Sequence, residues 1–191
     1  MDAMEALRTR RSIGKVLDKE IPAELIKNIL ESATWAPNHF KTEPWRFFVL
    51  TGDGRKSLGE VLARIAARDM DDPTTEENAS KLDRARKQPM RAPVIIVAAV
   101  EPSDNTKVIL KEEFAAVHAG VQNMLLAAHA LGLGAIWRTG KPCYDEEMKK
   151  LFGLSDRGEL VGFIYVGFPD MTPPPRKLKS VDEVTTWIDK E

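Results

Sequence analysis

Seven consecutive apolar residues, Val94-Ile95-Ile96-Val97-Ala98-Ala99-Val100, constrain the fold of this chain more than any other segment. They follow Pro93 and are rich in β-branched side chains, so we predict a strand. Successive side chains of a strand point to opposite faces of its sheet, and none of these seven is polar. The strand is therefore apolar enough to be covered on both faces.

Apolar residues at helical spacing predict three helices before this strand. A short helix ends near Arg10-Arg11-Ser12, a second opens at Pro22 and stops before Pro37, and a third follows Gly54. Their apolar faces are formed by Ala3, Met4 and Leu7; by Leu25, Ile26, Ile29, Leu30 and Ala33; and by Leu58, Val61, Leu62 and Ile65.

The longest predicted helix runs from about Lys107 to Leu131, is rich in Ala, and ends at Gly132. Because small residues let helices approach closely, we expect it to lie centrally, against another helix or its own symmetry mate. A last helix is predicted from the capping box of Ser180 and Glu183, with Val184, Trp187 and Ile188 on its apolar side. Further strands are predicted at 47–50 (buried), 135–138 and 160–166, a loop at 69–78, and a basic, solvated helical piece at 81–87.

Four short strands among at least six helices predict an α+β fold, with one sheet layered with helices, in a single domain spanning residues 1–191. Lys and Arg total 28 against 29 for Asp and Glu, which argues against a nucleic-acid binder. The single cysteine, Cys143, excludes an intrachain disulfide and favours a reducing compartment. With no signal-peptide pattern and no apolar run of about 20 residues, we expect a soluble, cytoplasmic protein.

The usual catalytic signatures are missing from the sequence. It contains no G-x-S-x-G elbow, no Walker loop and no H-E-x-x-H motif, and its three histidines and one cysteine show no metal-ligand spacing. Gly132-Leu133-Gly134 follows a helix instead of a strand and is not a dinucleotide-binding fingerprint. A cofactor that brings its own chemistry is the simplest remaining explanation.

Three segments are candidates for binding such a cofactor, and each also has a structural interpretation. Arg10-Arg11-Ser12 can clamp a phosphate, or can be a solvated helix end whose arginines favour the C-terminal dipole. The segment from Trp35 to Trp45 can wall a flat conjugated ligand, or can be a surface loop pinned by Trp45. Gly134–Gly140 ends a strand in Trp137, Arg138 and Thr139, which fits an anion ligand or a structural salt bridge.

Together these segments resemble the nitroreductase family, and the resemblance covers nearly the whole chain. Its motifs, in order, are Arg10-Arg11-Ser12 after the opening helix, Ala36-Pro37 and Pro44-Trp45-Arg46-Phe47, Arg91-Ala92-Pro93 before Val94, the Ala-rich helix, Gly132–Gly140, and Val161–Pro169. No single motif is specific, but their order and spacing are.

The resemblance implies the family's α+β fold with a mostly antiparallel sheet, in an intertwined homodimer holding FMN at the subunit interface. It implies that Arg10, Arg11, Ser12, Trp137, Arg138 and Thr139 bind FMN, and that His39 reaches the flavin from the other subunit. Trp35 and Lys41 are further candidates for residues that line the pocket. Lys41 stands where many members have asparagine, Glu43 where they often have glutamine, and Trp35 where some have arginine.

The implied activity is hydride transfer from NAD(P)H through FMN to an organic acceptor such as a nitroaromatic or a quinone. No side chain need act as acid or base in this scheme. The alternatives on the same fold are a flavin-binding or flavin-sequestering protein without turnover, and an enzyme that consumes the flavin. A further alternative is a cofactor-free interaction module built on the Ala-rich helix. Cys143 has no second cysteine to resolve a disulfide, so we predict a buried or incidental thiol.

Overall fold

The computed structural model describes residues 1–189. Its helices are α1 (Ala3–Thr9), α2 (Ala23–Thr34), α3 (Gly54–Ala67), α4 (Glu76–Lys87), α5 (Leu110–Ala130) and α6 (Glu146–Leu151). Its strands are β1 (Val16–Leu17), β2 (Trp45–Thr51), β3 (Val94–Val100), β4 (Gly134–Arg138) and β5 (Glu159–Pro169).

All strand pairs in the sheet are antiparallel, and β5 is its organising strand. One edge of β5 pairs with β3, which pairs in turn with β2, while the other edge pairs with β4 and, at its end, with β1. In this register Arg138 lies opposite Phe163 and Trp137 lies opposite Ile164. The predicted α+β fold with an antiparallel sheet is confirmed.

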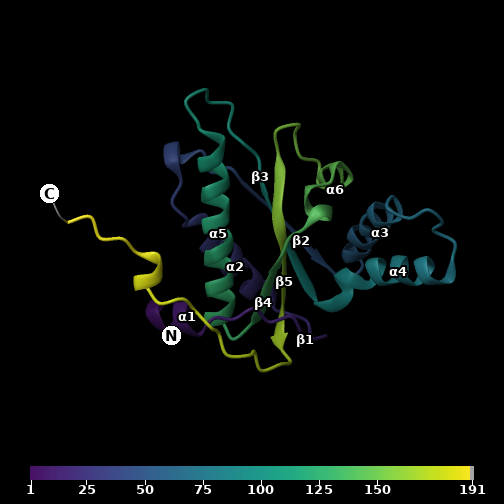
Figure 1. Ribbon diagram of the computed structural model, residues 1–191, viewed down its shortest axis with the longest axis horizontal. Coiled ribbons are helices and arrows are strands. Elements are labelled where there is room, and N and C mark those ends of the chain that lie inside the picture. Colours follow the sequence, from purple (N-terminus) through teal and green to yellow (C-terminus); the bar gives the residue numbers. More distant parts are fainter. Residues whose placement is uncertain (190–191) are drawn as a thin grey trace.

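Helices cover both faces of the sheet, with α2 and α5 on one face and α3 and α6 on the other (Figure 1). The seven residues of β3 are at most 2% exposed. Val94, Ile96, Ala98 and Val100 pack toward the α2–α5 layer, and the residues between them pack toward the α3–α6 layer. This alternation confirms the strand predicted to be buried on both faces.

The long helix α5 packs against α2, as its small residues predict. A Cβ atom added to Gly120 would lie 3.1 Å from the carbonyl oxygen of Ala33 on α2. The helix begins at Leu110, three residues later than predicted, because side chains before it bond to the backbone instead. The N–H of Asn105 donates to the Ser103 hydroxyl, and the N–H of Lys107 donates to the Asn105 side chain.

Two strand and loop predictions need correction. The predicted buried strand at 47–50 is part of β2, but Phe47, Phe48 and Leu50 are only half-buried and Val49 is exposed. The reason is that β2 is an edge strand that pairs with β3 alone. The predicted loop at 69–78 ends earlier, since Thr75 caps α4 by accepting the N–H of Asn78, and residues 76–78 form the first turn of α4.

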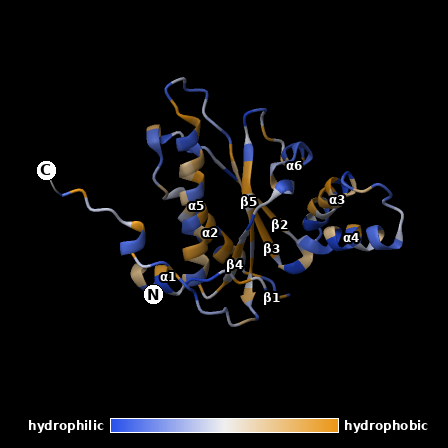
Figure 2. Ribbon diagram, viewed as in Figure 1, coloured by the Kyte–Doolittle hydropathy of each residue, from blue (hydrophilic) through white to orange (hydrophobic). Residues whose placement is uncertain are grey.

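The predicted C-terminal helix is wrong within the described residues. Ser180 and Glu183 do form the reciprocal hydrogen bonds of a capping box, but only one 3-10 turn, Asp182–Val184, follows. Val184, Trp187 and Ile188 are exposed, and the segment runs away from the body of the molecule (Figure 2). A short helix whose apolar side packs against nothing is only marginally stable, so the cap alone does not form it.

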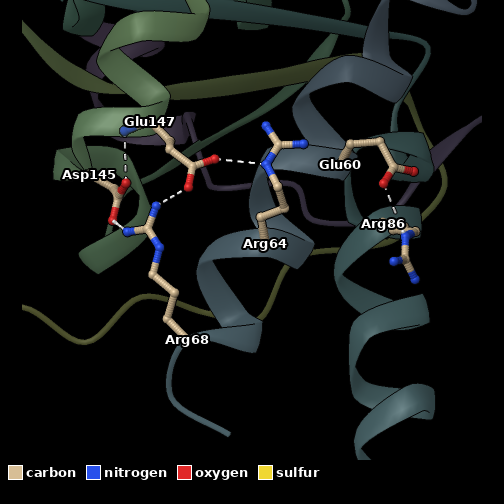
Figure 3. Close-up of polar contacts among 6 residues, drawn as sticks. All are labelled: Glu60, Arg64, Arg68, Arg86, Asp145 and Glu147. Carbon is tan, nitrogen blue, oxygen red and sulfur yellow. Dashed lines mark hydrogen bonds and ion pairs between the residues drawn. The ribbon is translucent and has the colours of Figure 1, made fainter. Parts of the chain in front are cut away.

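Ion pairs join α3 to its neighbours at the surface (Figure 3). Arg64 and Arg68 of α3 pair with Glu147 of α6, and Arg68 also pairs with Asp145. Hydrogen bonds from Arg64 and Arg68 lower the pKa of Glu147. On α4, Lys81 and Lys87 pair with acidic residues one turn earlier on the same helix, and Arg86 pairs with Glu60 of α3, so these charges of the basic piece face solvent.

Candidate functional site

The segment after α1 runs beside β4, which brings two of the predicted binding segments together. The backbone N–H of Ile13 donates to the carbonyl oxygen of Ala135 at 3.0 Å. A Cβ atom on Gly134 would lie 2.6 Å from Cγ2 of Ile13, so this approach requires glycine. An added Cβ on Gly14 would lie 3.9 Å from a guanidinium nitrogen of Arg138. Arg10-Arg11-Ser12 and Trp137-Arg138-Thr139 therefore border one region of the surface.

Three arginines, Arg10, Arg11 and Arg176, lie close together at this region. Burial lowers the pKa of Arg10, and the nearby charges of Arg176 and Arg11 lower it further. The guanidinium of Arg11 donates to the carbonyl oxygens of Arg8 at 2.8 Å and Arg10 at 2.9 Å, so this residue also caps the end of α1. None of the three forms an ion pair with a carboxylate in residues 1–189. The excess positive charge favours an anionic ligand.

Arg138 has a buried donor with no acceptor. Its Nε is buried and lacks a hydrogen-bond partner in the part of the chain that the structure describes. Its guanidinium lies 5.3 Å from the ring centre of Tyr165 on β5. Burial raises the pKa of Tyr165, and the charges of Arg138 and Arg91 oppose that shift. Because buried donors are almost always paired in proteins, an orphaned guanidinium nitrogen is the expected feature of a site built for a ligand.

Trp137 points to the other face of β4, toward α5. Its indole N–H donates to the carbonyl oxygen of Val161 at 3.0 Å, and its ring lies 5.6 Å from that of His118. A Cβ atom on Gly162 would lie within 2.0 Å of the indole nitrogen, so glycine is required there. Trp137 is thus a rigid support behind the site, while Ser12 and Thr139 are exposed at its border.

His39 lies at the opposite end of α5 from Arg10 and Arg11. Its Nδ1 is 2.5 Å from the carboxylate of Glu112, whereas the end of α1 is tied to His129 through the Thr9 hydroxyl at 2.8 Å. Glu112 and His129 are 17 residues apart on α5, which at 1.5 Å per residue is about 25 Å. Within one chain, His39 and the end of α1 that carries Arg10 and Arg11 therefore lie at opposite ends of α5.

Trp35 and Lys41 lie in different surroundings. Trp35 is 80% exposed and borders an apolar hollow of about 490 Å³ between α1, α2 and α5, together with Met1, Leu7 and Leu126. Lys41 is exposed in the loop after Asn38, and its ammonium group forms no ion pair within residues 1–189.

Sequence reasoning did not identify Arg176, Tyr165 and Arg91 as part of this region. Arg91 and Tyr165 lie inside motifs that carry the family resemblance, and that position was an available signal. Arg176 follows Pro173-Pro174-Pro175, and nothing in the local sequence connects it with Arg10. Only the path of the chain after β5 brings the two together.

Cys143 is buried, as predicted, and burial raises its pKa from 9.0 to about 12. At pH 8 such a thiol is ionised to about one part in ten thousand.

For this reason we expect a maleimide not to label Cys143 in the native protein at pH 8, and to label it completely in urea. Intact mass measures the labelling. Because the folded state keeps a proton that the unfolded state releases, this thiol lowers the free energy of unfolding as the pH rises from 9.0 to 12. Rapid labelling of the native protein would contradict the prediction.

The described part of the chain offers neither a metal site nor a membrane span. No group of three or more His, Cys, Asp or Glu side chains within residues 1–189 is arranged to hold a metal ion. In the same range, no helix combines the length and the apolar character needed to cross a bilayer.

The fold and its arginines define a class of protein: an α+β protein with an antiparallel sheet and a group of arginines near β4. The chain belongs to the nitroreductase family, because the model of the family described as "Nitroreductase family" matches residues 7–168. The "Putative NAD(P)H nitroreductase YdjA" of Escherichia coli (strain K12) is 36% identical over 90% of each chain. YfhC of Bacillus subtilis (strain 168), which carries the same description, is 33% identical over 91% of this chain and 87% of its own.

Solved structures agree with this assignment. A nitroreductase-like family protein from Bacillus cereus superimposes with a TM-score of 0.84 at 27% identity, over 100% of this chain and 97% of the other. A protein from Desulfovibrio desulfuricans, described as a "putative nitroreductase in complex with fmn", has a TM-score of 0.73 at 27% identity over 100% and 99% of the two chains.

Proposed function

We propose that this chain is an FMN-dependent oxidoreductase that accepts hydride from NAD(P)H and reduces an organic acceptor such as a nitroaromatic or a quinone. The observation that carries the proposal is the cluster of arginines without counterions beside β4, with the unpaired Nε of Arg138 among them. Membership of the family and the FMN-containing relative support the choice of this cofactor.

The residues of this region fit the phosphate end of FMN. Arginine binds phosphate through two parallel N–H donors and keeps its charge at any physiological pH. Arg10, Arg138 and Arg176 would hold the phosphate, and Ser12 and Thr139 would donate hydroxyl hydrogen bonds from the border of the site. Arg11 would contribute charge while it caps α1.

When bound, FMN supplies the hydride and electron chemistry, which the side chains of this protein do not provide. The chain's own task is to hold and orient the cofactor and to place positive charge beside it. Trp137 keeps β4 rigid through its hydrogen bond to Val161. Lys41 and His39 carry the nitrogen atoms that would approach the isoalloxazine ring. No residue is assigned as an acid or base.

The site would be completed by a second copy of the chain in a homodimer. His39 lies about 25 Å along α5 from the end of α1 that carries Arg10 and Arg11 in its own chain, and it would serve the site of the partner subunit, as the family resemblance implies. The exposed apolar residues support an extensive interface. They comprise Trp35 beside the hollow and, in the C-terminal segment, Leu178, Val181, Val184, Trp187 and Ile188. A partner would provide the packing surface that the single chain lacks.

The proposal is tested by a visible absorption spectrum of the purified protein, recorded before and after addition of NADH without oxygen. We expect flavin absorption bands at about 370 and 450 nm, and we expect them to bleach when NADH or NADPH is added. A protein that stays colourless after incubation with FMN would overturn the assignment. Bound flavin that neither nicotinamide bleaches would instead indicate a flavin-binding protein without this turnover.

A further inference from the structure

Glu113 is one of two charged side chains that are buried among the described residues, the other being Arg55. Glu113 is 1% exposed and lies in the first turn of α5. The Thr42 hydroxyl donates to one of its carboxylate oxygens at 2.5 Å, and the backbone N–H of Ser103 donates to the other at 3.1 Å. Burial of a carboxylate is costly unless its oxygens are hydrogen-bonded, and the helix N-terminus offsets only part of that cost.

The loop that Glu113 holds has a strained backbone. Three of its residues that are not glycine have positive φ angles: 62° at Phe40, 52° at Lys41 and 49° at Glu43. Residues other than glycine rarely adopt a positive φ because it is costly, so the surroundings must fix the conformation. Hydrogen bonds do so from inside the loop, since the Asn38 side chain accepts the N–H of Glu43 at 2.7 Å and donates to Thr42 at 3.2 Å.

Thr42 connects this loop to α5, because its hydroxyl contacts both Asn38 and the buried Glu113. The preceding residue of α5, Glu112, contacts Nδ1 of His39 at 2.5 Å. The first turn of α5 therefore holds the loop at two points. Glu113 holds it on the buried side, and Glu112 holds it on the exposed side. His39 and Lys41 are exposed in this loop, as are Phe40 and Glu43.

We propose that Glu113 is a positioning residue: its buried carboxylate fixes the strained loop so that His39 and Lys41 are presented to the flavin of the partner subunit. This inference rests on the proposed FMN site and adds to it a residue that does not touch the cofactor. A purely structural Glu113 would affect the free energy of unfolding but not the affinity or the spectrum of FMN in folded protein.

The test compares Glu113→Gln and Glu113→Ala in the FMN-loaded homodimer at a temperature well below thermal unfolding. We expect Glu113→Ala to raise the FMN dissociation constant about tenfold or more, and to alter the visible circular dichroism of the bound flavin. Glu113→Gln should retain much of the affinity, because its amide group can accept from Ser103 and donate to Thr42. Leu58→Ala is the control for lost stability, since Leu58 is fully buried on the opposite face of the sheet.

The background of His39→Ala with Lys41→Ala gives the decisive comparison. If Glu113 acts through these two side chains, Glu113→Ala should cause no further loss of FMN affinity in that background. A full effect there would overturn the inference, as would an unchanged dissociation constant and flavin spectrum in folded Glu113→Ala. Failure of the unmodified protein to bind FMN would instead overturn the proposed function.

Discussion

Replacement of Arg138 by alanine is expected to weaken FMN binding by about 100-fold, the largest effect of any single site residue. A hydrogen bond to a charged group contributes about 1.5–3 kcal/mol, and 1.4 kcal/mol corresponds to a factor of ten in affinity. Two such bonds from one guanidinium to a phosphate account for the expected loss. Titration of the apoprotein with FMN, followed by flavin fluorescence, measures it.

The unpaired Nε also predicts the sign of the effect on stability. Without ligand, a buried donor that lacks an acceptor lowers the free energy of unfolding. We therefore expect Arg138→Ala to leave the thermal midpoint of the apoprotein unchanged or raised, and to remove the increase that FMN causes in the unmodified protein. The control is Arg157→Ala, which removes an exposed arginine paired with Asp104. An FMN-induced increase of normal size in Arg138→Ala would refute the phosphate contact.

Mixed dimers extend this prediction to the shared site. If each site takes Arg138 from one chain and His39 from the other, a heterodimer of Arg138→Ala and His39→Ala has one site with both lesions and one intact site. Mixing the two variants after partial unfolding and refolding should restore tight FMN binding in the heterodimer, at one FMN per dimer. Two equally weakened sites per heterodimer would show that both residues serve the same chain's site.

Replacement of Gly162 by alanine is expected to lower the free energy of unfolding by about 3 kcal/mol, the upper end of the range for an overpacked interior. The added Cβ would lie 2.0 Å from Nε1 and 2.5 Å from Cδ1 of Trp137, and 2.9 Å from the carbonyl oxygen of Arg138. Two of these neighbours are atoms of a held indole ring, and the third is backbone. Trp137 must therefore move and lose its hydrogen bond to Val161. Urea unfolding followed by circular dichroism measures the change.

Gly54→Ala is the matched control, because no atom lies within 4 Å of a Cβ added there. We expect that control to change the free energy of unfolding by less than about 0.5 kcal/mol. Smaller residues at position 137 should relieve the clash, so Gly162→Ala should cost less in a Trp137→Ala background than alone. Full additivity of the two substitutions would contradict the proposed cause.

Several elements follow from the sequence because their causes are local. The all-apolar run of β3 can be buried only on both faces of a sheet, and the apolar stripes of α2 and α3 define their packing sides. Pro22 and Gly132 mark helix ends through their own backbone preferences. The order of the motifs also predicted the family, and this prediction is confirmed over residues 7–168.

Other features depend on contacts between distant segments. The capping box predicted at Ser180 and Glu183 is present, but the helix predicted after it is not formed in the described residues. Such a helix needs a packing surface, which the described part of this chain does not provide. The half-exposed state of β2 depends on its place at the sheet edge, which no property of residues 47–50 specifies.

The candidate site divides in the same way. The sequence by itself determined which side chains are suited to hold an anion, because the charge and the donors of a guanidinium group belong to the arginine residue itself. The tertiary structure decided that Arg176 joins Arg10 and that Arg138 keeps a buried donor unpaired within the described residues. It also placed His39 about 25 Å along α5 from the end of α1 that carries Arg10. These are distances and accessibilities, and they are set by the packing of helices and strands that are far apart in the chain.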